Sequence, residues 1–248
     1  MPVNEKFVVE LGKKLEPLSW QERLVALRGF SDRSIAFSTS FSFEDQSLTH
    51  VIAREKLPVR LFTLDTGRLF EETHKVHQQT CERYGVSIDT YYPDAKKAQE
   101  YVATHGINGF YASVENRKSC CFLRKVEPLG RALKGVDIWL SGLRHEHSDT
   151  RSNLGCVEWD SVHNLVKVYP LIDVKADDLW AFIRVESIPY NALHDKGFPS
   201  IGCSPCTRAI APGEPLRAGR WWWEQQSAQE CGLHMVDGKL VRSKVSHD

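Results

Sequence analysis

The residues best suited to chemistry in this sequence are its seven cysteines. They stand at Cys81, Cys120, Cys121, Cys156, Cys203, Cys206 and Cys231. Their number is odd, and the N-terminal MPVNEKFVVELGKK carries acidic residues instead of an apolar export signal, which argues against a secreted disulfide framework. In a reducing compartment such residues serve as metal ligands, nucleophiles or buried thiols. The sequence therefore predicts a cytoplasmic protein.

Four of the cysteines form two close pairs. Cys120 and Cys121 are adjacent, and Cys203 and Cys206 form a CxxC motif in GCSPCTR. A CxxC motif places two sulfurs on one side of a turn, and a second pair completes the four thiolates that a closed zinc site or a four-iron cluster requires. Successive side chains diverge in a helix or a strand, and a cluster tolerates that divergence better than a single zinc ion. Spacing alone leaves both metal centres open.

The seventh cysteine has a different setting. Cys231 lies in ECGLH near the C-terminus, with His234 three positions later and two arginines upstream in RAGR. A thiolate is a nucleophile, and nearby cations lower the pKa of its thiol. The pattern favours a nucleophile, and an incidental tail cysteine is the alternative. For Cys81 and Cys156 we expect small buried thiols.

Regular elements must position these residues, and the sequence alternates strand and helix patterns. An amphipathic helix is predicted at 19–30, a buried strand at 34–38, and a polar loop STSFSFEDQ before a helix in SLTHVIARE. Later units are the run RLFTL before a long helix closed by Gly85, the strand pattern SIDTYYPD before AKKAQEYVATHG, and the strand DIWLSG. Such alternation is typical of βαβ crossovers, so we predict an α/β fold with a mostly parallel sheet and helices on both faces.

Parallel sheets bind ligands at the carboxyl ends of their strands. The loops at 38–45, 65–68 and 142–151 all follow predicted strands, so we expect them to form one pocket. After Pro212 the sequence is rich in Gly, Pro, Arg and Trp. We therefore divide the chain into a domain at 1–211, which carries the pocket and the two cysteine pairs, and a mobile C-terminal segment at 212–248, with the Trp221–Trp223 run packing that segment rather than stacking bases.

Charge and composition exclude several classes of protein. The 32 basic residues balance 32 acidic ones, so no overall field favours nucleic acid or a membrane surface. No apolar run approaches the length that spans a bilayer, and 42% hydrophobic residues can fill a core. We expect a small-molecule substrate at a locally built anion site; a homo-oligomer is compatible with the sequence.

Taken together, the motifs resemble the adenylyl-sulfate reductases, the thioredoxin-dependent, iron–sulfur branch of the adenylyl and phosphoadenylyl sulfate reductase family. The resemblance extends over about residues 34 to 234 and is carried, in order, by STSFSFEDQSL, LDTGRLFEETH, SCCFLRK, SGLRHEHSDTR, VYPLIDVKADDLWAFI, IPYNALHDKGFPSIGCSPCTRAI, RAGRWWWE and ECGLH. It implies a Rossmann-like fold of the adenine-nucleotide α-hydrolase type.

The resemblance also implies a cofactor, a reaction and a partner. The four paired cysteines, Cys120, Cys121, Cys203 and Cys206, would hold a 4Fe-4S cluster. Adenosine 5′-phosphosulfate would be reduced to sulfite and AMP through an S-sulfocysteine on Cys231. Thioredoxin or glutaredoxin would release the sulfite, because no other cysteine lies near Cys231 in the sequence.

The residues that match the family's site follow from the same motifs. The catalytic set would be Cys231, His234 and Lys125. The substrate-binding set would be Ser38, Ser40, Asp65, Thr66, Gly142, Arg144, Arg151, Arg217 and Arg220. For Asp65 and Thr66 a helix cap is the alternative, and for Arg144 a solvated surface charge. The loop at 38–45 contains no glycine, so we expect it to bind a single phosphate but not to cleave ATP.

Three other functions remain as alternatives. The nearest is reduction of 3′-phosphoadenylyl sulfate, alone or together with the unphosphorylated substrate. The second is an ATP pyrophosphatase, which the glycine-free loop disfavours. The third is a zinc-stapled binding module without enzymatic activity, which the metal content of the protein would distinguish.

Overall fold

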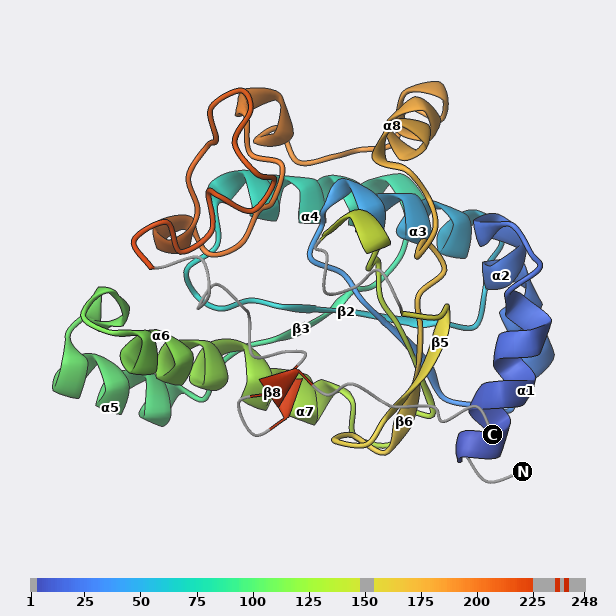
Figure 1. Ribbon diagram of the computed structural model, residues 1–248, viewed down its shortest axis with the longest axis horizontal. Helices are drawn as coiled ribbons and strands as arrows, with labels where there is room; N and C mark the ends of the chain where they lie inside the picture. Colours follow the sequence, from blue (N-terminus) through green and yellow to red (C-terminus); the bar gives the residue numbers. More distant parts are fainter. Residues whose placement is uncertain (1–3, 148–153, 225–234, 237–238, 241–248) are drawn as a thin grey trace.

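A six-stranded sheet forms the centre of the computed structural model, which describes residues 4–147, 154–224, 235–236 and 239–240 (Figure 1). The strand order is β3-β2-β1-β4-β6-β5, and all neighbours are parallel except β5 and β6. The strands are β1 (Ile35–Ser38), β2 (Arg60–Leu64), β3 (Asp89–Tyr91), β4 (Ile138–Leu140), β5 (Val157–Asp160) and β6 (Leu165–Val168). The predicted, mostly parallel sheet is confirmed, and the antiparallel edge is an addition to it.

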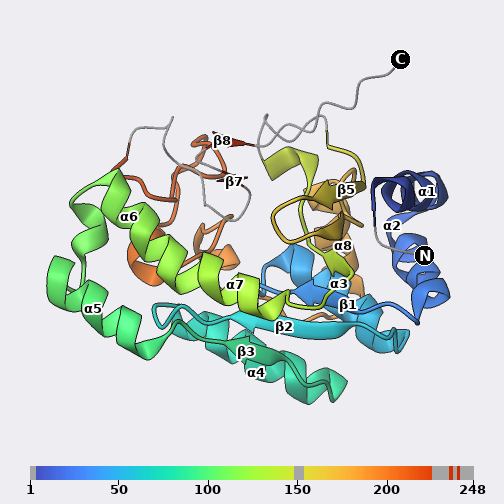
Figure 2. The same cartoon turned by 90° about the horizontal axis from the view of Figure 1, so that it is seen from below.

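Helices cover both faces of this sheet (Figures 1 and 2). They are α1 (Glu5–Leu15), α2 (Trp20–Ala26), α3 (Phe43–Arg54), α4 (Glu71–Tyr84), α5 (Ala95–His105), α6 (Val114–Cys121), α7 (Glu127–Ala132) and α8 (Ala176–Val185). Short 3₁₀ turns lie at Leu27–Phe30, Gly109–Tyr111, His145–His147, His194–Lys196 and Ser204–Cys206, and a hairpin joins Met235–Val236 to Lys239–Leu240. Among the described helices, none combines the length and the apolar character that crossing a membrane requires.

The strands alternate their side chains between two cores, as the pleat requires. In β1, Ile35 and Phe37 join the large core beneath α1, α3, α4 and α8, whereas Ala36 faces the smaller core beneath α7. In β4, Trp139 belongs to the smaller core. Burial on both faces explains why these strands read as continuous apolar runs in the sequence.

Helix α3 begins earlier than the predicted helical stretch 47–55. Ser42 is its N-cap, and the Ser42 hydroxyl accepts a hydrogen bond from the Asp45 amide at 3.2 Å. Two acidic residues, Glu44 and Asp45, follow in the first turn, where the helix dipole favours them. The loop after β1 is therefore only four residues long, from 39 to 42. Asp45, predicted in a loop, lies on a helix.

Helix α6 continues into α7 through a π turn at Phe122–Val126. Insertions of this kind are rare and occur frequently at functional sites. The turn lies directly after Cys120 and Cys121 and contains Lys125. It therefore sets the direction of three predicted site residues at once.

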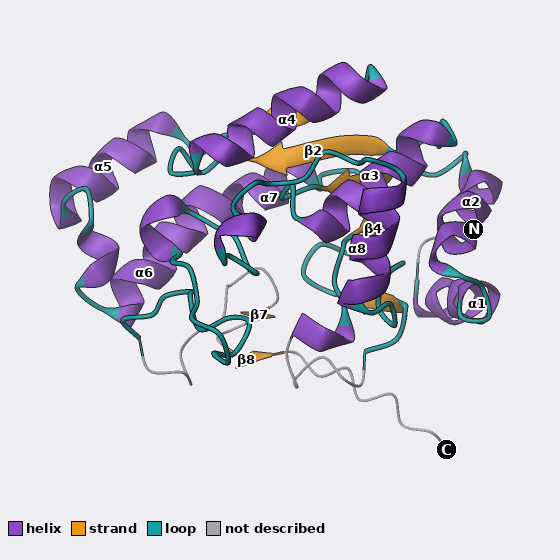
Figure 3. Ribbon diagram, turned by 90° about the horizontal axis from the view of Figure 1, so that it is seen from above, coloured by secondary structure: helices purple, strands orange, loops and turns teal. Residues whose placement is uncertain are grey.

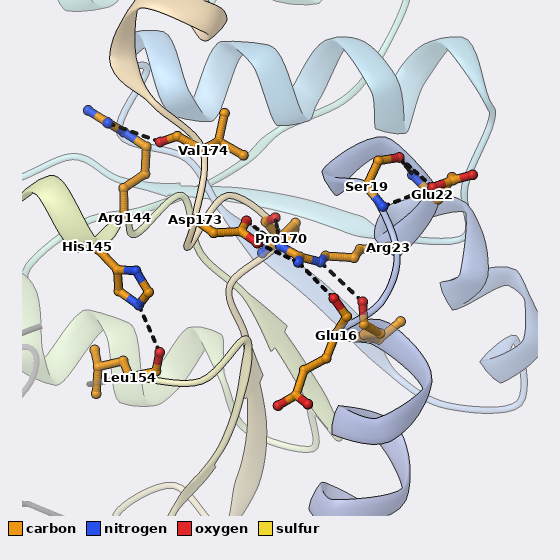
Figure 4. Close-up of polar contacts among 11 residues, drawn as sticks. Glu16, Ser19, Glu22, Arg23, Arg144, His145, Leu154, Pro170, Asp173 and Val174 are labelled. Carbon is orange, nitrogen blue, oxygen red and sulfur yellow. Dashed lines mark hydrogen bonds and ion pairs between the residues drawn. The ribbon is translucent and has the colours of Figure 1, made fainter. Parts of the chain in front are cut away.

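The N-terminal helices are fixed to the sheet by one buried arginine (Figure 4). Arg23, in α2, donates to both carboxylate oxygens of Asp173 at 2.7 Å and to the carbonyl oxygen of Pro170 at 3.0 Å. Its remaining donors reach the carbonyl oxygens of Leu15 and Glu16. The bidentate pair joins α1 and α2 to the segment after β6.

Candidate active site

A pocket of about 760 Å³ lies at the carboxyl ends of β1, β2 and β4. It is covered by the segment around α8, which is seen in front of the sheet in Figure 3. All three predicted loops contribute to its wall, together with two later segments of the chain. Predicted residues that line it are Ser38, Ser40, Thr66, Lys125, Gly142, Arg144, Arg217 and Arg220.

The first loop is shaped by hydrogen bonds to Asp45. The Ser40 amide and the Ser40 hydroxyl both donate to Asp45 Oδ2, at 2.7 and 2.6 Å. Burial raises the pKa of Asp45 to about 6, against the opposing effect of the two Ser40 hydrogen bonds. The Asp45 carboxylate also packs where a side chain on Gly142 would lie. Gly142 is therefore required by contact with this carboxylate.

The loop turns without glycine. Phe41 takes a left-handed backbone conformation, with φ of 59°. Its side chain is buried and stacks on His77 with ring centroids 4.7 Å apart. Burial of an aromatic side chain offsets the strain that a non-glycine residue meets in this region. A left-handed position, which favours glycine, is thus occupied by a core residue.

Three predicted cations line the pocket. Lys125 comes from the π turn, and Arg217 and Arg220 come from the segment after Pro212. Arg220 donates to the Ser200 hydroxyl at 3.1 Å, lies over the Trp221 ring at 4.9 Å, and fills the space beside Gly202. Its Nε is buried and finds no hydrogen-bond acceptor among the described residues. An anion that entered the pocket beside these cations would meet a preformed positive field.

Arg144 is held differently from these three cations. It is 2% exposed, so the solvated surface charge considered above is excluded. Its guanidinium donates to Glu44 Oε1 at 3.0 Å, to Glu146 and to the carbonyl oxygen of Val174 at 3.3 Å, the last of which appears in Figure 4. Arg144 lines the pocket, and the carboxylates of Glu44 and Glu146 balance its charge. It therefore supports the pocket wall rather than adding to the positive charge for a bound anion.

Asp65 and Thr66 differ in their position relative to the pocket. Asp65 is not among the residues that line the pocket; its carboxylate accepts from the Gly67 amide at 2.8 Å and so closes the turn before α4. Thr66 does line the pocket. Its hydroxyl accepts from the Arg68 amide at 3.2 Å and lies 3.2 Å from Cys203 Sγ. Thr66 therefore connects the pocket to the cysteines.

The two cysteine pairs, distant in sequence, share one small space. Cys120, Cys121, Cys203 and Cys206, hereafter the cysteine cluster, pack with Phe110 and Trp221. Arg68, Arg117, Arg124 and Lys125 line the same space. Burial, and then the neighbouring Cys203 and Cys121, raise the pKa of Cys206 to about 12. Four sulfurs in this setting need compensating positive charge to ionise, which metal ions supply.

Within the described ranges, no three His, Cys, Asp or Glu side chains lie close enough to share a single metal ion. Lys125 is common to the walls of this space and of the large pocket. The two features are therefore adjacent, with Lys125 between them.

The tryptophan run packs onto the cysteine cluster. Trp221 is buried in it, and Trp223 lies edge-on to Tyr111 with centroids 4.4 Å apart. Arg117 donates to both carboxylate oxygens of Glu224 at 2.8 Å. The first part of the predicted C-terminal segment, up to Glu224, thus packs against the body of the protein. Trp221 and Trp223 serve this packing, whereas Trp222 is 40% exposed.

Three predicted site residues, Arg151, Cys231 and His234, lie outside the described residues. Cys156 is buried and Cys81 half-buried against the large core, as predicted for structural thiols. The sequence reasoning missed the wall made by Trp180, Tyr190 and His194. These residues lie in the quoted motifs DDLWAFI and IPYNALHD, so their position was visible although no role had been attached to it.

Comparison with known proteins agrees with this geometry. The sequence model of the phosphoadenosine phosphosulfate reductase domain matches residues 34–209. An "Adenosine 5′-phosphosulfate reductase" of Allochromatium vinosum is 52% identical over 201 residues, which cover 81% of this chain and 78% of that protein. One of Burkholderia cepacia is 47% identical over 227 residues, covering 92% and 90%.

Solved structures give the same picture. The crystal structure of a phosphoadenylyl-sulfate reductase from Candida auris, a phosphate complex, matches with a TM-score of 0.71 and 26% identity, covering 85% of this chain and 99% of that one. Yeast FAD synthetase in complex with FAD matches with a TM-score of 0.54 at 14% identity, over 82% of this chain and 68% of that one, and shares the fold alone.

Proposed function

The chain belongs to the phosphoadenosine phosphosulfate reductase domain family, and from this premise we propose that it reduces adenosine 5′-phosphosulfate to sulfite and AMP during sulfate assimilation. The observation that carries the proposal is the high similarity, over most of both chains, to relatives named for that activity. The pocket supports it physically, because three cations line a space that can hold a nucleotide.

Binding and activation of the substrate are assigned to the cationic side chains that line the pocket. Lys125, Arg217 and Arg220 would neutralise the phosphosulfate and, in the transition state, the charge that develops on the departing phosphate. Ser38 and Ser40 would contact the nucleotide from the first loop. Water has reduced access to the buried Arg220, so its charge is less screened there than on an exposed surface.

The reaction itself is assigned to Cys231. Its thiolate attacks the sulfate sulfur, a Cys–S bond to that sulfur forms, the bond between this sulfur and the phosphate oxygen breaks, and AMP leaves. The product on the enzyme is S-sulfocysteine. His234 and the arginines would keep the Cys231 thiol ionised.

Release of sulfite requires an external dithiol, and we propose thioredoxin or glutaredoxin in the cytoplasm. One thiolate of the dithiol attacks Cys231 Sγ and expels sulfite, which leaves a mixed disulfide. The second thiol resolves that disulfide and restores the Cys231 thiol. The dithiol is oxidised by two electrons, and the bound sulfonate leaves as sulfite.

The cysteine cluster is proposed to hold a 4Fe-4S centre. The fit rests on four thiols from two segments around one space and on the surrounding cations. Such a centre would act as a staple between these segments and as a fixed charge beside Lys125. The zinc alternative predicts a colourless protein, whereas iron and sulfide give a brown one with broad visible absorption.

The nearest alternative is reduction of 3′-phosphoadenylyl sulfate, and the match to the Candida auris reductase keeps it open. Steady-state kinetics with both nucleotides, with thioredoxin as reductant, decide between them. We expect a higher kcat/KM for adenosine 5′-phosphosulfate. A strong preference for the 3′-phosphorylated substrate would overturn the assignment.

The covalent step has its own test. After one turnover without reductant, mass spectrometry should find an added SO₃ on Cys231. The Cys231→Ser variant should bind AMP and keep its iron but release no sulfite. Cys81→Ser is the matched control and should behave as the wild type, because Cys81 packs against the core away from the pocket. An unmodified Cys231 after turnover would rule out this mechanism.

A further inference from the structure

The indole of Trp139 reaches the pocket through Ser38. Trp139 Nε1 donates a hydrogen bond to Ser38 Oγ at 2.8 Å. Both residues line the pocket, Trp139 from β4 and Ser38 from the end of the neighbouring strand β1. An indole N–H can only donate, so the Ser38 oxygen must be the acceptor in this pair.

The direction of that bond determines what Ser38 can do. A serine hydroxyl has one proton to donate, and among the described residues none accepts a hydrogen bond from Ser38. Ser38 is half-buried and faces the pocket, whereas Trp139 is 3% exposed. Trp139 occupies one of the two lone pairs of Ser38 Oγ and so fixes the orientation of the hydroxyl, which leaves its proton to be donated to an acceptor in the pocket.

Two charged or aromatic side chains also contact the indole ring of Trp139. The Lys167 ammonium lies 4.9 Å over the Trp139 ring, and the His163 ring stands edge-on at 6.1 Å. Both side chains are tied to Asp160, each at 2.9 Å. Burial would raise the pKa of Asp160, but the His163 hydrogen bond and the Lys167 charge lower it below its ordinary value. Asp160 thus stays ionised and keeps both partners in place.

We propose that Trp139 is a positioning residue for nucleotide binding: it fixes the Ser38 hydroxyl as a donor to an acceptor atom of the bound nucleotide. The inference rests on the proposed function for the identity of the ligand. It adds a residue of the β4 strand, outside the three loops, to the determinants of the site.

A double-mutant cycle tests this role, with AMP as the probe. Ser38→Ala and Trp139→Phe should each weaken AMP binding, measured by calorimetry, by about three- to tenfold, the range expected for one neutral hydrogen bond. The double variant should bind no more weakly than Ser38→Ala alone, because Trp139 acts through Ser38. Effects that multiply in the double variant, or an unchanged affinity in Trp139→Phe, would overturn the inference.

Two further measurements protect this result. Trp159→Phe is the control, since Trp159 lies on β5 and does not line the pocket. If Trp139→Phe fails to fold, the indole N–H signals of the wild type and of Ser38→Ala decide: one indole proton should lose hydrogen-exchange protection in Ser38→Ala, and unchanged spectra contradict the bond. Wild type that binds AMP but does not turn over adenosine 5′-phosphosulfate refutes the proposed function alone; absence of AMP binding refutes both.

Discussion

Asp45 is the residue at which the first loop and the pocket wall meet. It holds Ser40 by two hydrogen bonds and packs against Gly142. Asp45 is buried, and burial raises the pKa of its carboxyl from 3.8 to about 6. A carboxyl whose pKa is higher in the folded state binds its proton more tightly there, so this group makes the protein less stable as pH rises from about 4 to about 6.

The first prediction at this scale concerns Asp45→Asn. Relative to this variant, the wild type should lose roughly 2–3 kcal/mol of unfolding free energy between pH 4 and pH 6.5, since each pKa unit corresponds to about 1.4 kcal/mol. Urea unfolding at four pH values in that interval measures the difference. Asp32→Asn, at an exposed position, should follow the wild type. Parallel pH profiles for wild type and Asp45→Asn would contradict the burial argument.

The π turn at Phe122–Val126 is the element that joins the two parts of the site. It follows the last turn of α6, where Cys120 and Cys121 lie, and turns Lys125 to the border between the cysteine cluster and the pocket. The same helix holds the C-terminal segment, because Arg117 and Glu224 form an ion pair that is 1% and 3% exposed. Helix α6 therefore fixes the point from which the chain continues toward Cys231.

A prediction follows for the ion pair between Arg117 and Glu224. Glu224→Gln removes the carboxylate opposite a buried guanidinium and should cost about 3 kcal/mol of unfolding free energy, because a buried charge that loses its partner is expensive. Chemical denaturation measures it. Glu214→Gln breaks the comparable Arg208 pair, which is about one-third exposed, and should cost less than 1 kcal/mol. If Glu224→Gln cost no more than Glu214→Gln and both cost less than 1 kcal/mol, the Arg117–Glu224 ion pair would add little stability.

At the scale of the whole molecule, the cysteine cluster brings three distant segments together. Helix α6, the 203–206 turn and Trp221 meet there, and Thr66 links them to the strand β2 side of the pocket. The proposed metal centre would thus stabilise the body that carries the pocket, as well as lie beside Lys125.

Removal of the metal tests this. Oxidative loss of iron, or Cys206→Ser, should lower the Tm by roughly 10 °C, corresponding to a few kcal/mol for a chain of this size. Iron content and the visible spectrum should fall in parallel. Cys156→Ser, at a buried cysteine far from the cluster, should keep its iron. A Tm that does not depend on iron content would argue against a structural role.

The mostly parallel sheet and the types of residue at the site were predictable from the sequence, whereas the antiparallel β5–β6 edge was not. Several features are local patterns that can be recognised in the sequence: the apolar runs in β1 and β4, the cap at Gly85 and the two cysteine pairs. The same holds for Ser38, Gly142, Arg217 and Arg220, which lie where strand ends and motifs placed them.

The tertiary structure alone decided how these residues are used. It separated Asp65, turned into its own loop, from Thr66, which touches Cys203, and it gave Arg144 two carboxylates instead of solvent. It also placed Trp139 against Ser38, 101 positions away. The reason is that hydrogen bonds and ion pairs act over a few ångströms in space, and neighbours across parallel strands are set by packing rather than by spacing along the chain.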